Sequence, residues 1–302
     1  MRRLAPALLA LPLLVVAGAC ATAAERGGAE TATAPTPVPR PTPLRGPATF
    51  VYAGELTQGG WLKGSVPGGT IALTLDGAAV DIAPDGRFLV AFDRDAAPGA
   101  TLVAQLGDGH SVTAALAIAP RTWQIEYIAV EQRPGALPSA EYERRRAIEV
   151  AQINAARRIV SGSQGWQQDF VWPAIGRISG RFGAQRVYRG NLGSYHSGID
   201  IATGGSGSPY VAPADGVVIL AAEAPFTLEG NLLMIDHGNG LSSAFLHSSR
   251  LLVKAGDVVH RGQAIGLIGM TGRATGPHLH WSIKWREARL DPILFAGTMP
   301  GL

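Results

Sequence analysis

The chain has 302 residues, of which 46% are hydrophobic and 16% are charged, and its formal net charge is +3. This much apolar material is sufficient for packed cores and excludes a chain that is disordered throughout. The weak charge, without a long basic run, excludes nucleic acid as an expected partner. Gly at 39 positions and Pro at 21 favour strands and turns over long helices, and the length allows two modest domains.

Residues 1–20 have the pattern of an export signal. Arg2 and Arg3 give a positive start, and the uncharged run that follows is rich in Leu, Val and Ala but short for a membrane-spanning helix. The run ends in small residues directly before Cys20, the single cysteine, and this resembles the lipobox of bacterial lipoproteins. We expect an exported, periplasmic lipoprotein that is anchored to a membrane through Cys20. The alternative is ordinary signal cleavage near Ala23.

Residues 21–48 are predicted to form a linker. The segment is rich in Pro, Thr and Ala, and its alternating prolines favour extended polyproline structure without a packed core. At about 3.1 Å per residue it would reach on the order of 80 Å. Such a linker would let an anchored domain act at a distance from the membrane.

Residues 49–120 consist of short runs with period-two alternation, separated by turn dipeptides such as Asp-Gly. The clearest run contains Ile71, Leu73 and Leu75. Such runs predict a small β-sandwich. His110 lies beside a predicted turn and is expected at the surface, so the default role of this domain is that of a spacer or binding module.

Residues 121–169 are expected to connect two domains through a helix over 139–161. Ser139 can cap the N-terminus of this helix. Apolar residues recur at helical spacing and are expected to form its buried face: Ile148, Ala151, Ala155 and Ile159. We expect a connector that contributes nothing to an active site.

Residues 170–302 return to strands and turns, and six of the seven histidines lie here. The run from His237 to Gly240 predicts a hairpin turn. His237 is therefore expected to be structural, and His260, beside an arginine and a glycine, is expected to be exposed.

The first of three segments suited to metal chemistry runs from His196 to Asp200. Residues four apart on an extended strand share a face, and Gly198 between them permits a bend. His196 and Asp200 can therefore reach one ion.

The other two segments are a predicted strand that contains His247 and the triplet from His278 to His280. His278 and His280 point the same way on a strand, so one can bind a metal while the other faces the remaining coordination position. Each motif alone is common by chance, but their coincidence in one glycine-rich β region indicates a metal site.

Two imidazoles and one carboxylate make a three-ligand zinc site with an open fourth position, which is the catalytic type. Water occupies such a position, where zinc lowers its pKa and polarises a substrate carbonyl. A nearby neutral histidine can take the proton and pass it to a leaving amine. His247 and His278 are the candidates for this role.

Taken together, these segments resemble the signature of the lysostaphin-type, or LytM-like, zinc endopeptidases. The runs between them, 210–218, 235–238 and 258–269, are similar to the family as well, and the resemblance covers about residues 172–295. It implies one Zn²⁺ per chain with the ligands His196, Asp200 and His280. It implies that the catalytic histidines are His247 and His278, and that a tyrosine supporting the transition state corresponds to Tyr188.

One departure from the family pattern is Ser248, which follows His247 where Leu or Met is usual. This change can alter packing beside the site, but it removes no ligand or base.

The patterns of residues 49–169 and this resemblance together predict a mainly β protein with an N-terminal β-sandwich, a connecting helix and a C-terminal antiparallel β peptidase domain. It implies a zinc-dependent endopeptidase that hydrolyses peptide bonds of peptidoglycan, by analogy with Gram-negative envelopes the D-Ala–diaminopimelate cross-link. The alternative is a wall-binding regulator or amidase activator that does not hydrolyse. Inactive relatives of that kind lack ligand residues, and this sequence lacks none. The oligomeric state stays open.

Overall fold

The computed structural model describes residues 44–128 and 139–301. The predictions for the export signal, for Cys20 and for most of the linker fall outside these residues. Among the described helices, none is both long and apolar enough to cross a membrane.

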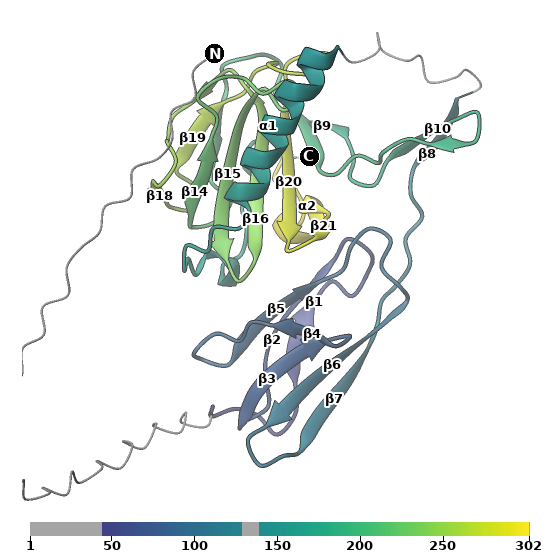
Figure 1. The fold of residues 1–302 in the computed structure, drawn as a ribbon, viewed down its shortest axis with the longest axis vertical. Helices are drawn as coiled ribbons and strands as arrows, with labels where there is room; N and C mark the ends of the chain where they lie inside the picture. The colour runs from purple at the N-terminus through teal and green to yellow at the C-terminus, as the bar shows by residue number, and fades with distance from the viewer. Residues whose placement is uncertain (1–43, 129–138, 302) are drawn as a thin grey trace, which may run out of the picture. The chain divides into compact units, whose positions relative to one another are not determined.

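The N-terminal β-sandwich is present as two antiparallel sheets (Figure 1). One has the order β1-β2-β5, with bounds Val51–Gly54, Trp61–Ser65 and Arg87–Ala91. The other has the order β4-β3-β6-β7, with bounds Ala78–Val80, Thr70–Leu75, Gly99–Leu106 and Ser111–Ala117. Leu62, Phe88 and Leu102 are fully buried in their shared core.

The alternation expected along β3 fails at Ile71, which is 63% exposed while Leu73 is buried. The pairing of β3 with β6 shifts register between Thr70 and Ala72. A bulge of this kind adds one residue to a strand and interrupts the alternation of its faces.

The connecting helix, α1, runs from Ala140 to Ala156, and the Ser139 hydroxyl accepts a hydrogen bond from the Tyr142 N–H, which confirms the predicted cap. The predicted buried face is wrong, because Ile148 and Ile159 are 62% and 48% exposed. The buried residues are instead Glu149, Ile153 and Ala156. Apolar spacing does not reveal this face because one of its members is a carboxylate.

The C-terminal domain is built on one large sheet in the order β18-β14-β15-β16-β20-β12-β9, with β21 beside β20, and all of its pairings are antiparallel (Figure 1). In that order the bounds are Val258–Val259, Gly216–Ala221, Asn231–Gly238, Leu241–Ser248, Leu279–Trp285, Ile199–Ala202, Arg177–Gly180 and, for β21, Ala288–Leu290. The predicted mainly β fold is confirmed.

Smaller elements complete the domain. One sheet has the order β13-β19-β17, with bounds Pro209–Val211, Ala264–Leu267 and Arg250–Leu251. Another has the order β11-β10-β8, with bounds Asn191–Leu192, Gln185–Tyr188 and Ile125–Ile128. The short helices are η1, Gly165–Gln167, and α2, Pro292–Ala296.

The predicted hairpin turn is confirmed between β15 and β16. Asn239 and Gly240 have φ values of 50° and 75°, and two successive residues with positive φ are what a tight hairpin turn requires.

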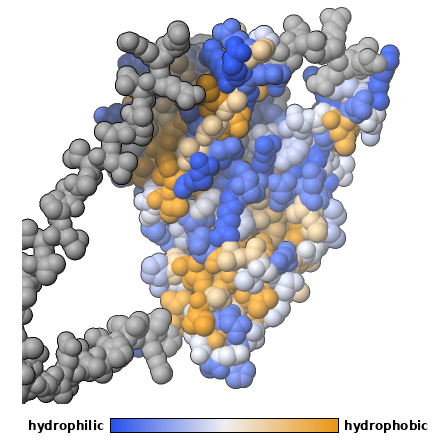
Figure 2. Space-filling model, viewed as in Figure 1, coloured by the Kyte–Doolittle hydropathy of each residue, from blue (hydrophilic) through white to orange (hydrophobic). Residues whose placement is uncertain are grey.

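Helix α1 lies across β14, β15 and β16 (Figure 1). Ile153 and Ala156 pack there in a small second core with residues such as Leu232 and Met234. The beginning of the helix presents hydrophilic side chains at the surface in Figure 2. Leu246 of β16 packs in this core as well and pairs with His280 of β20, so the helix covers part of the face of the sheet to which His280 belongs.

The sandwich contacts the C-terminal domain through polar groups. The buried guanidinium of Arg94 donates to the Gly183 carbonyl at 3.0 and 3.2 Å and to the Gln185 side chain at 3.0 Å. The indole N–H of Trp61 donates to the Leu294 carbonyl. Because Gly183 lies in the segment that holds His196, these contacts stand close to the site described next.

Candidate metal centre

The three predicted ligands come from neighbouring strands. Asp200 of β12 pairs directly with His280 of β20, and side chains of directly opposed residues lie on the same face. His196 precedes β12 and is held by its backbone, whose N–H donates to Ala184 and whose carbonyl accepts from Gly183. Antiparallel pairing thus brings together residues that lie 80 positions apart.

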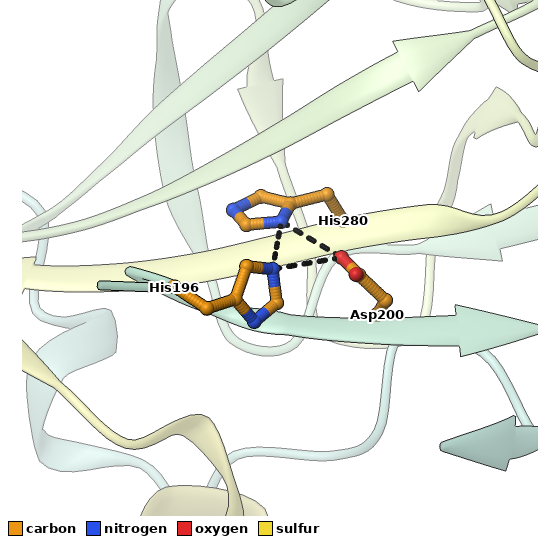
Figure 3. Close-up of side chains that lie close together, drawn as sticks. All are labelled: His196, Asp200 and His280. Atoms are coloured by element: carbon orange, nitrogen blue, oxygen red, sulfur yellow. Dashed lines mark hydrogen bonds and ion pairs between the residues drawn. The ribbon is translucent and has the colours of Figure 1, made fainter. Parts of the chain in front are cut away.

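Their polar atoms meet at one point (Figure 3). His196 Nε2 lies 3.1 Å from Asp200 Oδ1 and 3.0 Å from His280 Nδ1, which is 2.9 Å from the same carboxylate oxygen. His196 Nδ1 lies 3.0 Å from the Arg181 carbonyl. A carbonyl can only accept, so Nδ1 carries the proton in a neutral ring and the Nε2 lone pair faces the centre.

The electrostatics of this group favour a cation. Burial raises the pKa of Asp200, but the contacts of its carboxylate with the rings of His196 and His280 outweigh burial and hold that pKa far below its usual range. Burial lowers the pKa of His280, whereas for His196 the contact with Asp200 outweighs burial and raises the pKa. The carboxylate is therefore ionised, and a nearby positive charge stabilises it. A metal ion or a proton on His196 can supply that charge.

Two glycines leave the space that the ligands occupy. A Cβ on Gly180 would lie 2.3 Å from Asp200 Oδ2, and a Cβ on Gly198 would lie 2.8 Å from His280 Nε2. The ligand atoms all lie within 4.8 Å of one another. Two nitrogens and one carboxylate oxygen are the donors of a catalytic zinc site, so the residues fit this metal.

His247 and His278 lie beside the three ligands, with ring centroids 4.9 Å apart. His278 Nε2 lies 3.7 Å from Asp200 Oδ1. His247 Nδ1 lies 2.8 Å from the Thr271 carbonyl, and His278 Nδ1 lies 2.8 Å from the Gly276 carbonyl. In each neutral ring Nδ1 is therefore the donor and Nε2 is free to accept a proton. Burial lowers the pKa of His247 to about 4, so its ring is neutral at pH 7.

Tyr188 lies in β10 of the small sheet, where its side chain interacts with the guanidinium of Arg186. Its role in the transition state stays a prediction. Ser248, the departure from the family pattern, is fully buried, and its hydroxyl lies 2.7 Å from the hydroxyl of Tyr210. A serine suits this position because it satisfies a buried phenol.

The two histidines expected to be structural or exposed behave so. His237 is fully buried near the end of β15, with Nδ1 2.8 Å from the Asp215 carbonyl and Nε2 2.9 Å from the Ser243 hydroxyl. His260 has a side chain that is 75% exposed.

Sequence reasoning missed the groups that orient the site. The backbone carbonyls of Arg181, Thr271 and Gly276 leave no side-chain signal in the sequence. Gly198 could be recognised because it stands between two ligands in the sequence. Gly180 could not, because it lies on another strand and is not adjacent to any ligand in the sequence.

An ionised carboxylate and two histidines around one point, with two further histidines beside them, form a group that could hold a metal ion on an antiparallel β domain. Residues 194–292 match the family model described as Peptidase family M23. The predicted resemblance to lysostaphin-type metallopeptidases is thereby confirmed for this part of the chain.

Curated proteins from other bacteria are similar to part of this chain. Peptidoglycan DD-endopeptidase ShyA of Vibrio cholerae serotype O1 is 43% identical over 121 residues, which cover 40% of this chain and 26% of that protein. DD-carboxypeptidase/endopeptidase Mpg of Neisseria meningitidis serogroup B is 36% identical over 126 residues, 42% of this chain and 28% of that protein. The chain thus spans about a quarter of the length of these relatives.

A solved structure is similar over more of the chain. The crystal structure of a putative peptidase M23 from Pseudomonas aeruginosa superimposes with a TM-score of 0.61 and 27% sequence identity, covering 80% of this chain and 95% of that one. The likeness therefore extends beyond residues 194–292.

Proposed function

We propose that this protein is a zinc-dependent endopeptidase that hydrolyses peptide bonds in peptidoglycan. The observation that carries the proposal is the convergence of His196, Asp200 and His280 within 4.8 Å, with His247 and His278 beside them. The family match and the names of the two curated relatives support it.

In this proposal His196, Asp200 and His280 hold one Zn²⁺ per chain. Zinc, when bound, supplies a Lewis acid and an activated water. Arg181 fixes the ring of His196 through its carbonyl, so that the Nε2 lone pair faces the centre. The absence of a side chain at Gly180 leaves room for the Asp200 carboxylate.

His247 and His278 move the protons. Each holds a proton at Nδ1 against a backbone carbonyl, which leaves Nε2 to accept a proton from the attacking water or to deliver one to the leaving amine. Because the two rings are close neighbours, one can act as base and the other as acid. Tyr188 is proposed to support the transition state on the family resemblance alone.

For the scissile bond we propose the D-Ala–diaminopimelate cross-link, since the names of the relatives contain DD-endopeptidase. Purified peptidoglycan is incubated with the zinc-loaded protein, and the released muropeptides are identified by mass spectrometry. We expect cross-linked dimers to become monomers, with no conversion by His280→Ala or in chelator. Zinc binding without release from any wall type would favour a regulator or amidase activator that does not hydrolyse, and release unaffected by both controls would contradict the zinc mechanism.

We also propose that the protein is exported and anchored in the periplasm through a lipid on Cys20. The support is the sequence pattern that ends at this cysteine. Cells that express the protein are labelled with a radioactive fatty acid. Label in wild type but not in Cys20→Ala is expected, and an unlabelled, soluble wild-type protein would favour ordinary cleavage.

A further inference from the structure

Helix α1 makes a dense polar contact with the loop before β15. Arg146 pairs with Glu229 in a bidentate manner, at 2.6 and 2.7 Å. Glu149 accepts from the backbone N–H and the hydroxyl of Thr227, at 2.7 and 2.8 Å. Arg145 donates to the carbonyl of Pro225 at 2.6 Å. Three helical side chains thus hold one loop of five residues.

The charges in this contact are withdrawn from water. The side chains of Glu149, Glu229 and Arg146 are 6%, 15% and 22% exposed. Burial raises the pKa of Glu149, but hydrogen bonds from Thr227 and Arg146 outweigh it, so the carboxyl stays ionised. A buried pair of this kind is costly to break by removing one partner, and it specifies one geometry of the loop.

The same loop holds the backbone of His247. The Glu229 carbonyl accepts the His247 N–H at 2.8 Å. The neighbouring Gly230 packs so tightly against Thr271 that a Cβ would lie 2.2 Å from its hydroxyl, and this threonine supplies the carbonyl that accepts from His247 Nδ1. The Glu229 carbonyl, which accepts from the His247 N–H, therefore belongs to the loop that α1 holds. The Thr271 carbonyl, which accepts from His247 Nδ1, belongs to a residue that packs against Gly230 at the end of this loop.

His247 needs such support because its backbone is strained. Its φ is +66°, in the left-handed region that a residue with a side chain avoids. The pairing of β15 with β16 shifts register here, from Asn231 opposite Ser248 to Leu233 opposite Phe245, so the His247 N–H leaves the ladder and turns to Glu229. Strained conformations persist where the surroundings over-determine them and cluster at functional sites.

We propose that helix α1 positions His247 through Arg146 and Glu149, by fixing the loop whose Glu229 carbonyl holds the His247 backbone. Arg146 and Glu149 are positioning residues and touch no reacting atom. The catalytic consequence rests on the proposed function, whereas the effect on the His247 backbone does not. The helix is then part of the machinery and more than the connector that its sequence suggested.

The test uses the full chain with three variants: Arg146→Ala, Glu149→Gln and the control Arg144→Ala, which alters an exposed residue on the same helix. Hydrogen exchange of the His247 amide is followed by NMR. We expect exchange of the His247 amide to accelerate by about 10-fold or more in the first two variants, because the Glu229 carbonyl that accepts its hydrogen bond is no longer held in place. The control stays within about 2-fold of wild type.

Activity and metal binding are measured on the same proteins, with a purified cross-linked muropeptide as substrate. We expect kcat to fall by about 10- to 100-fold in Arg146→Ala while KM stays within about 3-fold, since a misplaced acid–base group loses much of its contribution. Zinc affinity stays within about 3-fold of wild type because no ligand belongs to this network. Arg146→Lys, which keeps the charge but not the bidentate geometry, is expected to be intermediate.

Unchanged exchange at His247 together with unchanged kcat would overturn the proposal. So would a parallel loss of zinc affinity and kcat, which would show a general effect on the domain. If wild type hydrolyses no wall material, the proposed function fails, but the exchange rates still decide whether α1 holds His247. If Arg146→Ala does not fold, Arg146→Lys and Glu149→Gln carry the same test.

Discussion

Replacing Gly180 by alanine tests the architecture of the metal centre without touching a ligand. The added Cβ would lie 2.3 Å from Asp200 Oδ2 and 3.1 Å from His196 Cε1. Restoring ordinary contact requires the carboxylate to move by about 1 Å. Zinc–oxygen distances deviate from their usual length by only about 0.2 Å. A carboxylate displaced this far can therefore no longer serve as a normal ligand. We expect zinc affinity to fall by about 100-fold, or about 3 kcal/mol.

The assay is a competition titration with a chromophoric chelator, and thermal unfolding in excess chelator serves as a check of the fold. Gly205→Ala is the matched control, because its Cβ would meet nothing within 4 Å. We expect both variants to unfold close to the wild-type temperature when zinc is removed. A Gly180→Ala protein that binds zinc within about 3-fold of wild type would refute the assignment of this cradle as the metal centre.

Three further predictions concern single side chains. His278→Ala should retain zinc in a competition titration but lose about 10²- to 10⁴-fold in kcat, and loss of zinc would mean that this histidine is a ligand. Burial lowers the pKa of His237 to about 4, whereas the ring in the unfolded chain titrates at about 6.5. The free energy of unfolding is therefore undiminished above about pH 6.5, and it falls by about 3 kcal/mol as the pH falls to about 4. Urea unfolding in chelator should show a shallower acid dependence for His237→Asn, and identical slopes would contradict this origin. Arg94→Ala should lower the free energy of unfolding by about 2–3 kcal/mol, because it leaves the Gly183 carbonyl unpaired; an unchanged urea midpoint would count against this contact.

Those parts of the site that depend on strand geometry could be predicted from the sequence. Alternation along one strand places His278 and His280 on one face, and Gly198 explains how His196 and Asp200 approach each other. The family resemblance supplied the assignment of roles. The carbonyls that orient the rings could not be predicted, because any residue type provides them.

The role of α1 lay beyond sequence reasoning for a different reason. Apolar spacing indicated a face with Ile148 and Ile159, but the buried face includes Glu149, whose partner Thr227 lies 78 residues away. Pairing between a buried carboxylate and a distant loop leaves no periodic signal. The exposure of Ile71 has a comparable cause, because a bulge changes the alternation without any mark in the sequence.

We propose above that His196, Asp200 and His280 hold a zinc ion at which a peptidoglycan peptide bond is hydrolysed. The most direct measurement is mass spectrometry of muropeptides after incubation of purified cross-linked dimers with protein that carries one zinc per chain. We expect wild type to convert dimers into monomers and His280→Ala to convert none. Dimers that remain intact with zinc-loaded wild type, or that are cleaved equally by His280→Ala, would contradict it.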